Sequence, residues 1–325
     1  MGKKILILKN DRVGDFFHSL RNIENLRKYF SEYTTDILLS KINIRFSNTL
    51  NQTNLNIIEV NYRLSLLEKF NLFFKLMRNN YEYVFILSPK NFYFFLPLIF
   101  KNTRFLGICI ENKTRNRPIM FLRKFLFKYE VNNRANNLRK NTIYDMEKKL
   151  LENIIPSSKK KEPYEVVKYN LNGKPIHVLF HYKSDIFGDI HKNILQFHEL
   201  FLQLKNQFNM KIRVSTDLEF KITKNTFDKI FGGSENIEFL GPIDADDLIM
   251  EVVSSDLIIS PHGAITCIAA YYNKNIIDIF DRTITRNAFC EFKPYTRGSY
   301  QFIFKSLDIN KTFNKISYKI NNLFE

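Results

Sequence analysis

The stretch DLIISPHGAITCIAAYYNKNIIDIFDRT, residues 256–283, constrains the fold more than any other part of the chain. An apolar run at 257–259 stops at a Ser-Pro-His-Gly turn, a helix-like segment follows at 264–272, and a second apolar run spans 276–280. This order of strand, turn, helix and strand predicts a βαβ unit. The turn also suits an anion such as phosphate, because a helix begins with unpaired amides and the positive end of its dipole. The alternative is an ordinary crossover in which Gly263 only shapes the turn, and the motif alone does not decide between the two.

Similar apolar runs occur elsewhere in the chain. Those at 4–8, 83–87 and 176–180 are typical of buried parallel strands. The segment 64–77 predicts an amphipathic helix. The segment 111–140 is basic and poor in periodicity, which predicts a loop or a solvated face.

The length of the chain indicates more than one domain. Its 325 residues exceed the roughly 100–200 usual for one domain. The Pro-, Ser- and Lys-rich region that includes 161–174 is the best linker candidate. We therefore expect an α/β fold with domains at 1–160 and 175–305, followed by a C-terminal helix at 306–325 that packs back across them. Two consecutive α/β domains leave a cleft between their strand ends, where pockets preferentially form.

Composition limits the compartment and the class of partner. The chain has 49 Lys and Arg against 33 Asp and Glu, a net charge of +16, which attracts nucleic acid, phosphorylated sugars or an anionic membrane without choosing among them. A biased genome is the alternative source of the many lysines. Cys109, Cys267 and Cys290 show no disulfide or zinc spacing, so a reducing compartment fits best. No signal peptide is evident, and the apolar run at 92–100 is shorter than the about 20 residues that span a bilayer.

The first candidate for chemistry is Asp15, in the segment KNDRVGD after the first apolar run. Gly14 permits close backbone approach at this turn. Asp15 falls in the first helical turn, where its structural role would be to compensate the helix dipole and its functional role to act as a general base. The exit of the first strand of an open α/β sheet is where clefts lie. Because no G-x-G-x-x-G pattern is present, we expect no nicotinamide or flavin cofactor.

Three stretches follow the order of a known family. ILILKNDRVGDFFHSLRNI contains Gly14, Asp15 and His18, IHVLFHYKSDIFGDIHKNILQFHELFLQL contains Lys192, and NIEFLGPIDADDLIMEVVSSDLIISPHGAITCIAAYYNKNIIDIF contains the candidate phosphate turn. Over most of the chain they resemble the heptosyltransferase-like family, glycosyltransferase family 9. The resemblance implies a GT-B architecture, in which two Rossmann-like domains face each other across a cleft.

The resemblance also implies an inverting, metal-independent transfer, with a nucleotide-diphosphate sugar as co-substrate and no other cofactor. Asp15 would accept a proton from the acceptor hydroxyl as that oxygen attacks the anomeric carbon. Lys192 and the backbone of Gly263 and Ala264 would stabilise the departing nucleoside diphosphate. His18 would assist the acceptor site or only pack the first helix.

The chain departs from the family at the phosphate turn. The usual Asp-Thr-Gly is His262-Gly263-Ala264 here, which changes the charge that faces the donor. A histidine could hydrogen-bond a diphosphate oxygen or become cationic beside it. The Trp-Pro that usually follows the lysine is Ile-Leu here.

Three further residues are weaker candidates on the donor side. Glu219 lies near the position of a family acid that contacts the nucleotide ribose. Lys183 and Arg282 are candidate helpers, with surface solvation as the alternative.

The expected function is that of a bacterial, cytoplasmic glycosyltransferase that moves a hexose or heptose to a lipopolysaccharide-core or other surface glycan. An anionic glycan or glycolipid acceptor, and peripheral contact with the inner membrane surface, would both suit the net charge. The alternatives are a GT-B-fold sugar-nucleotide epimerase or hydrolase and a non-catalytic basic binding protein. No nucleic-acid partner is expected, because the aromatic residues lie in apolar runs rather than among basic residues.

Overall fold

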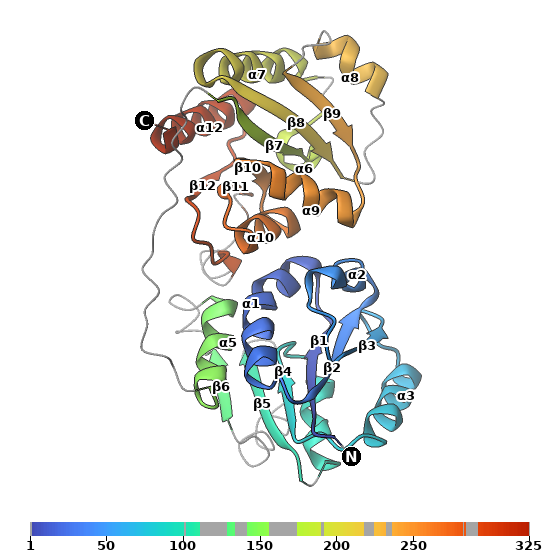
Figure 1. Ribbon diagram of the computed structural model, residues 1–325. Helices are drawn as coiled ribbons and strands as arrows, with labels where there is room; N and C mark the ends of the chain where they lie inside the picture. Colours follow the sequence, from blue (N-terminus) through green and yellow to red (C-terminus); the bar gives the residue numbers. More distant parts are fainter. Residues whose placement is uncertain are drawn as a thin grey trace. The chain divides into compact units, whose positions relative to one another are not determined.

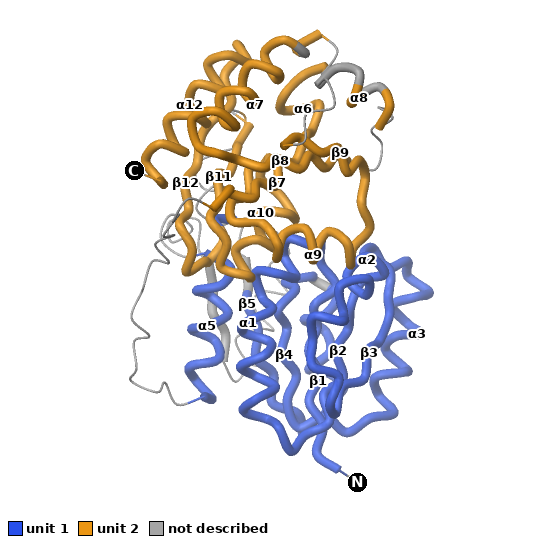
Figure 2. The backbone as a smooth tube through the Cα atoms, turned by 45° about the horizontal axis from the view of Figure 1, so that its top comes forward, with its two compact units in different colours: residues 1–161, 286–293 blue, residues 162–285, 294–325 orange. Residues whose placement is uncertain are grey.

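The computed structural model describes residues 2–100, 102–110, 129–133, 142–155, 174–189, 192–217, 224–231, 236–281, 283 and 292–324. The chain divides into two compact units (Figure 2). Unit 1 comprises residues 1–161 with 286–293, and unit 2 comprises 162–285 with 294–325. The predicted linker at 161–174 lies outside the described residues except for Lys174, and the predicted cleft between domains stays a prediction.

The described part of unit 1 holds a six-stranded parallel sheet in the order β3-β2-β1-β4-β5-β6 (Figure 1). Its strands are β1 (Lys4–Lys9), β2 (Thr34–Ser40), β3 (Leu55–Val60), β4 (Tyr83–Ile86), β5 (Arg104–Ile110) and β6 (Tyr129–Asn133). Its helices are α1 (Val13–Tyr29), α2 (Lys41–Ile44), α3 (Leu66–Met77) and α5 (Ile143–Glu152), with the short 3-10 helices η1 (Ser47–Thr49) and η2 (Asn91–Leu98).

Continuous burial explains why the central strands of unit 1 are apolar throughout. Helices cover both faces of a parallel sheet, so neither face of a central strand meets water. Residues 5–8 of β1 are fully buried. The neighbouring helices begin at defined caps, because Ser65 with Glu68 and Thr142 with Asp145 form capping boxes at α3 and α5.

Unit 2 repeats this architecture. Its described sheet is six-stranded and parallel, in the order β12-β11-β10-β7-β8-β9. The strands are β7 (Ile176–Tyr182), β8 (Met210–Thr216), β9 (Ile237–Gly241), β10 (Leu257–Pro261), β11 (Asn275–Phe280) and β12 (Tyr300–Phe304). The helices are α6 (Ser184–Phe187), α7 (Ile194–Phe208), α8 (Lys224–Phe231), α9 (Ala245–Ser254), α10 (Ala264–Tyr271) and α12 (Ile309–Phe324).

The strand orders place a topological switch point in each sheet. In unit 1, β1 pairs with β2 on one side and β4 on the other. In unit 2, β7 pairs with β8 on one side and β10 on the other. In open α/β sheets ligands bind outside the carboxyl ends of the strands at such a point. The residues that follow β1, β4, β7 and β10 are therefore the first places to look for function.

Several predicted elements are confirmed. The βαβ unit predicted at 256–283 is β10, α10 and β11, and the last helix is α12. Within unit 2, α12 buries Phe313, Ile316 and Ile320 in the core of the sheet and packs on α7; its reach across both domains stays a prediction. Of the segment 111–140, predicted to be a loop or a solvated face, only 129–133 is described; the loop is wrong there, because β6 forms and pairs with β5. In the described part of the chain, no helix combines the length and hydropathy needed to cross a bilayer.

Candidate functional site

Asp15 lies where the sequence predicted, in the first turn of α1, and its side chain is half-buried. The helix begins at Val13, so the dipole favours the charged carboxylate. Asp15 also contributes to the field at two neighbouring lysines, Lys9 and Lys90, whose ammonium groups it favours. Lys9 is the last residue of β1 and Lys90 follows β4, the two strands that pair at the switch point, so Asp15 lies near that point.

A buried ion pair, which the sequence did not reveal, supports the loop before Asp15. Lys9 is 1% exposed, and its Nζ lies 3.4 Å from Oε1 of the fully buried Glu147 on α5 and 3.2 Å from Oδ2 of Asp11. Ser19 and Asn22 of α1 donate hydrogen bonds to the Glu147 carboxylate. Burial alone would lower the pKa of Lys9, but the carboxylates around it outweigh burial and raise that pKa. Burial raises the pKa of Glu147, which Lys9 opposes.

The loop between β1 and α1 is anchored to neighbouring strand ends. The carbonyl of Asp11 accepts hydrogen bonds at 3.0 Å from Ser40 Oγ at the end of β2 and from Asn43 Nδ2 of α2. The carbonyl of Asn10 accepts from Lys90 Nζ at 2.9 Å, after β4. Burial lowers the pKa of Lys90, although the nearby carboxylates of Asp11 and Asp15 act in the opposite direction. The loop that leads from β1 into α1 and Asp15 is therefore held by residues at or just after the ends of two neighbouring strands.

The two other candidates in α1 are in different situations. Gly14 lies inside the first turn of the helix and not in the loop before it. His18 is 6% exposed and lies among the buried residues of α1. This burial favours the packing alternative for His18 over contact with an acceptor.

In unit 2, His262 follows β10 and is held by three contacts. Its Nδ1 lies 2.8 Å from Oδ2 of Asp278, its ring stacks on Phe280 with centroids 4.2 Å apart, and its amide donates to Ile279. Tyr300 donates a second hydrogen bond to the same Asp278 oxygen at 2.7 Å. Burial raises the pKa of Asp278, which the hydrogen bond from His262 opposes. An Asp–His pair of this kind fixes the orientation of the ring, and Nε2 is the ring nitrogen that the bond to Asp278 does not use.

The turn after His262 forms the start of α10. Gly263 is the N-cap residue, and its amide donates to Thr266 Oγ1 at 3.2 Å, so this amide is engaged within the turn. Ala264 is the first helical residue, and the amides at the start of a helix have no intrahelical partner. The anion-binding capacity predicted for this turn therefore falls on Ala264 and the residue after it, with the dipole of α10 behind them.

The remaining predicted donor-side residues are dispersed. Lys192 is exposed and lies just before α7. Lys183 follows β7, is 42% exposed and lies 3.5 Å from Asp185. Glu219 and Arg282 lie outside the described residues.

A histidine on the neighbouring strand was not singled out from the sequence. His181 near the end of β7 lies 3.0 Å from Ser215 Oγ and 3.2 Å from Asp217 Oδ1, both at the end of β8. The hydrogen bond from His181 lowers the pKa of Asp217. The parallel register of β7 and β8 pairs His181 with Ser215. The alternation of side chains along the two strands was therefore the sequence signal that could have revealed this contact. Among the described side chains, no three of His, Cys, Asp or Glu gather as ligands of a metal ion would.

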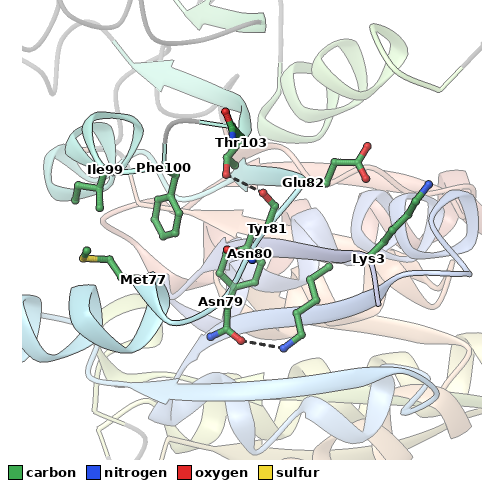
Figure 3. A pocket seen from close by; sticks show the side chains of 11 residues that line it. Lys3, Met77, Asn79, Asn80, Tyr81, Glu82, Ile99, Phe100 and Thr103 are labelled. Atoms are coloured by element: carbon green, nitrogen blue, oxygen red, sulfur yellow. Dashed lines mark hydrogen bonds between the residues drawn. The ribbon is translucent and has the colours of Figure 1, made fainter. Parts of the chain in front are cut away.

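A cavity of about 620 Å³ lies at the amino ends of the unit 1 strands, the opposite end from Asp15 (Figure 3). Its walls include Lys4 at the start of β1, Glu82 just before β4 and Thr103 just before β5. Lys4 donates to Asn79 at 2.9 Å within it. Because it sits at the amino ends of the strands, this cavity is separate from the candidate residues around Asp15.

Comparisons with known proteins agree with this geometry at the level of the fold. No family model and no curated protein sequence matches the chain. Among solved structures, the Escherichia coli heptosyltransferase WaaC with ADP matches 98% of this chain and 99% of its own, with a TM-score of 0.66 and 13% identity. The chain has a heptosyltransferase-like fold. The same enzyme has also been solved with ADP-2-deoxy-2-fluoro heptose.

Two further structures give the range of this fold. The E. coli ADP-heptose LPS heptosyltransferase II matches 99% of this chain and 98% of its own, with a TM-score of 0.64 and 12% identity. A Listeria monocytogenes protein described as a UDP-N-acetylglucosamine 2-epimerase matches 99% of this chain and 88% of its own, with a TM-score of 0.58 and 11% identity. The architecture predicted from the sequence, two parallel α/β units of GT-B type, is confirmed.

Proposed function

We propose that the chain is a glycosyltransferase that moves a sugar from a nucleotide-diphosphate donor to a glycan acceptor. The observation that carries this proposal is the heptosyltransferase-like fold, matched over 98% of the chain, with candidate residues at the switch points of both sheets. Asp15 stands beside the ends of β1 and β4 in unit 1, and His262 follows β10 in unit 2. A fold of this kind also hosts other sugar-nucleotide chemistry, so these residues carry the functional argument.

Unit 1 supplies the general base in this proposal. The Asp15 carboxylate takes the proton of an acceptor hydroxyl as the oxygen forms its bond to the anomeric carbon. The bond between that carbon and the donor phosphate breaks, so the transfer inverts the anomeric configuration. The anchored loop from β1 to α1 keeps the carboxylate in position, which is what proximity catalysis requires.

Unit 2 receives the leaving group. The first amides of α10 and Nε2 of His262 stabilise the charge of the departing nucleoside diphosphate. Lys192 adds a cation. Asp278 holds the ring of His262 through Nδ1, so that Nε2 is the ring nitrogen that can hydrogen-bond a phosphate oxygen. In this role His262 hydrogen-bonds the leaving group without a metal ion.

For the donor and acceptor, we propose a nucleoside-diphosphate heptose or hexose and a lipopolysaccharide-core or similar surface glycan. The structure of WaaC with ADP and that of the ADP-heptose LPS heptosyltransferase II support an adenine nucleotide as the first choice. The net charge of +16 suits an anionic acceptor. A cytoplasmic location follows from this choice, as part of the same proposal.

A second candidate is a sugar-nucleotide epimerase or hydrolase, which the fold match to the Listeria protein favours. Such an enzyme converts the donor in the absence of any glycan acceptor. A transferase leaves most of the donor intact until acceptor is added. Chromatography of the donor with and without an acceptor extract therefore separates the two.

The proposal is tested by thermal shift of the intact protein with ADP-, GDP-, UDP- and CMP-linked sugars. We expect one nucleotide class to raise the melting temperature, and the same class to yield free nucleotide in the presence of glycan acceptor. His177→Ala, at the start of β7, serves as a matched control for His262→Ala. If no nucleotide sugar stabilises the protein, the transferase assignment is wrong.

A further inference from the structure

The helix α3 of unit 1 turns a second apolar face outward. Leu66, Leu67, Phe70, Phe74 and Met77 are each between 47% and 70% exposed. A helix of a soluble domain normally keeps polar residues on its outer face. Five large apolar side chains on the outside of one 12-residue helix therefore need a partner that the core does not supply.

The helical repeat shows that these residues form one stripe. Leu66, Phe70, Phe74 and Met77 are spaced by four, four and three, which places them along a single face. The core takes the other side of the helix through Leu72 and Leu76. At 1.5 Å per residue the stripe runs for about 18 Å.

The 3-10 helix η2 lies beside α3 and carries two further exposed apolar residues. Phe73 of α3 and Phe92 of η2 lie with ring centroids 6.3 Å apart, which puts the two elements side by side. Phe95 and Leu98 of η2 are also exposed. Met77 lines the same cavity as residues 99 and 100, immediately after η2 (Figure 3). We call the exposed residues of α3 and η2 the apolar face: Leu66, Leu67, Phe70, Phe74, Met77, Phe95 and Leu98.

Basic residues border the apolar face. The segment 63–78 contains four cations, Arg63, Lys69, Lys75 and Arg78, and one acid, Glu68. Glu68 is engaged by the amide of Ser65 and by Asn61 as part of the helix cap, and these hydrogen bonds lower its pKa. Arg63, Lys75 and Arg78 are exposed. The border is therefore positively charged.

We propose that the apolar face docks on an anionic lipid bilayer, with α3 lying in the plane of the lipid headgroups. An interfacial helix has large apolar residues on the buried side and Lys or Arg along its border, and it is held by both apolar burial and attraction to anionic lipids. A second copy of the chain is a poorer occupant, because a two-fold interface would bring the same cations of both copies together. This surface is independent of the proposed transferase activity.

Flotation of the intact protein with vesicles of phosphatidylcholine, with and without one quarter phosphatidylglycerol, tests the proposal. We expect binding to the anionic vesicles and little to the neutral ones. Phe70→Ser with Phe74→Ser should lower the partition coefficient about 25-fold, at about fivefold for each ring. Lys75→Gln with Arg78→Gln should lower it by about fivefold for each charge.

Leu195→Ser with Leu307→Ser is the matched control, since both residues are exposed apolar side chains of unit 2. This control should bind as the wild type does, and the melting temperatures of all variants should stay close to that of the wild type because the changed residues are on the surface. Equal binding of the Phe70→Ser/Phe74→Ser variant and the control would overturn the proposal. So would a concentration-dependent dimer that the Phe substitutions abolish, because the occupant would then be a second copy.

Discussion

The substitution Glu147→Gln tests whether a buried charge supports the segment that leads from β1 to Asp15. Glutamine keeps the shape of the side chain and one acceptor oxygen, but it removes the negative charge 3.4 Å from the Lys9 ammonium. Breaking a buried ion pair typically costs about 3–5 kcal/mol. Lys9 keeps Asp11 at 3.2 Å and the Leu87 carbonyl at 3.3 Å. The loss should therefore fall near the lower end, about 3 kcal/mol.

For a unit of this size, about 3 kcal/mol corresponds to a fall in melting temperature of about 6–12 °C. Glu152→Gln, an exposed position on the same helix, should change the unfolding free energy by less than about 0.5 kcal/mol. The pair itself is isolated by adding Lys9→Met to Glu147→Gln. The double variant should lose about 2 kcal/mol less unfolding free energy than the two single variants lose together, because neither charge is then left alone.

The measurement is urea unfolding followed by circular dichroism for the four proteins of this cycle and the control. Additive losses in the double variant would show that Lys9 and Glu147 do not interact. A Glu147→Gln variant as stable as Glu152→Gln would refute the reasoning altogether. Either result would remove the ion pair as the support of the loop from β1 to α1.

Two further predictions concern unit 2. His262→Ala should weaken binding of the nucleotide by about tenfold, since a charge-assisted hydrogen bond is lost. Asp278→Asn should weaken it by less, because the ring stays on Phe280. Calorimetry with the nucleotide that gives the largest thermal shift measures both affinities, and an affinity of His262→Ala equal to that of His177→Ala would make the histidine purely structural. Gly263→Ala should change the melting temperature little, because an added Cβ meets only the Pro261 carbonyl at 4.0 Å. Gly298→Ala should lower the melting temperature by several degrees, because its Cβ would overlap the Lys274 carbonyl. Equal effects of the two substitutions in thermal unfolding would contradict this prediction.

The parts of the fold that were predicted are those set by local pattern. Continuous apolar runs identify buried parallel strands without any knowledge of their neighbours. The strand–turn–helix at Asp15 and the βαβ unit around His262 were therefore visible in the sequence. The strands β6 and β12 were not, because their sequences, YEVNN and YQFIF, mix polar and apolar residues at the edges of the sheets.

The contacts that support the candidate residues were harder to predict because they join distant parts of the chain. Lys9 and Glu147 are 138 residues apart, and each looks like a surface residue in its own segment. Asp278 carried a detectable signal, since it is a lone acid within the buried run of β11. The period of α3 predicted an amphipathic helix, but it could not show that a second set of apolar residues faces outward, since that depends on where the core lies.

The most direct test of the proposed function compares Asp15→Asn with wild type for both nucleotide binding and sugar transfer. Asparagine preserves the shape at the start of α1 but cannot accept the acceptor proton. The account predicts that nucleotide affinity stays within about threefold while transfer to glycan acceptor falls at least about 100-fold. Glu24→Gln, further along the same helix, should keep full activity. Full transfer activity in Asp15→Asn would contradict the account of Asp15 as the base, and loss of nucleotide binding in that variant would contradict its assignment to the acceptor side.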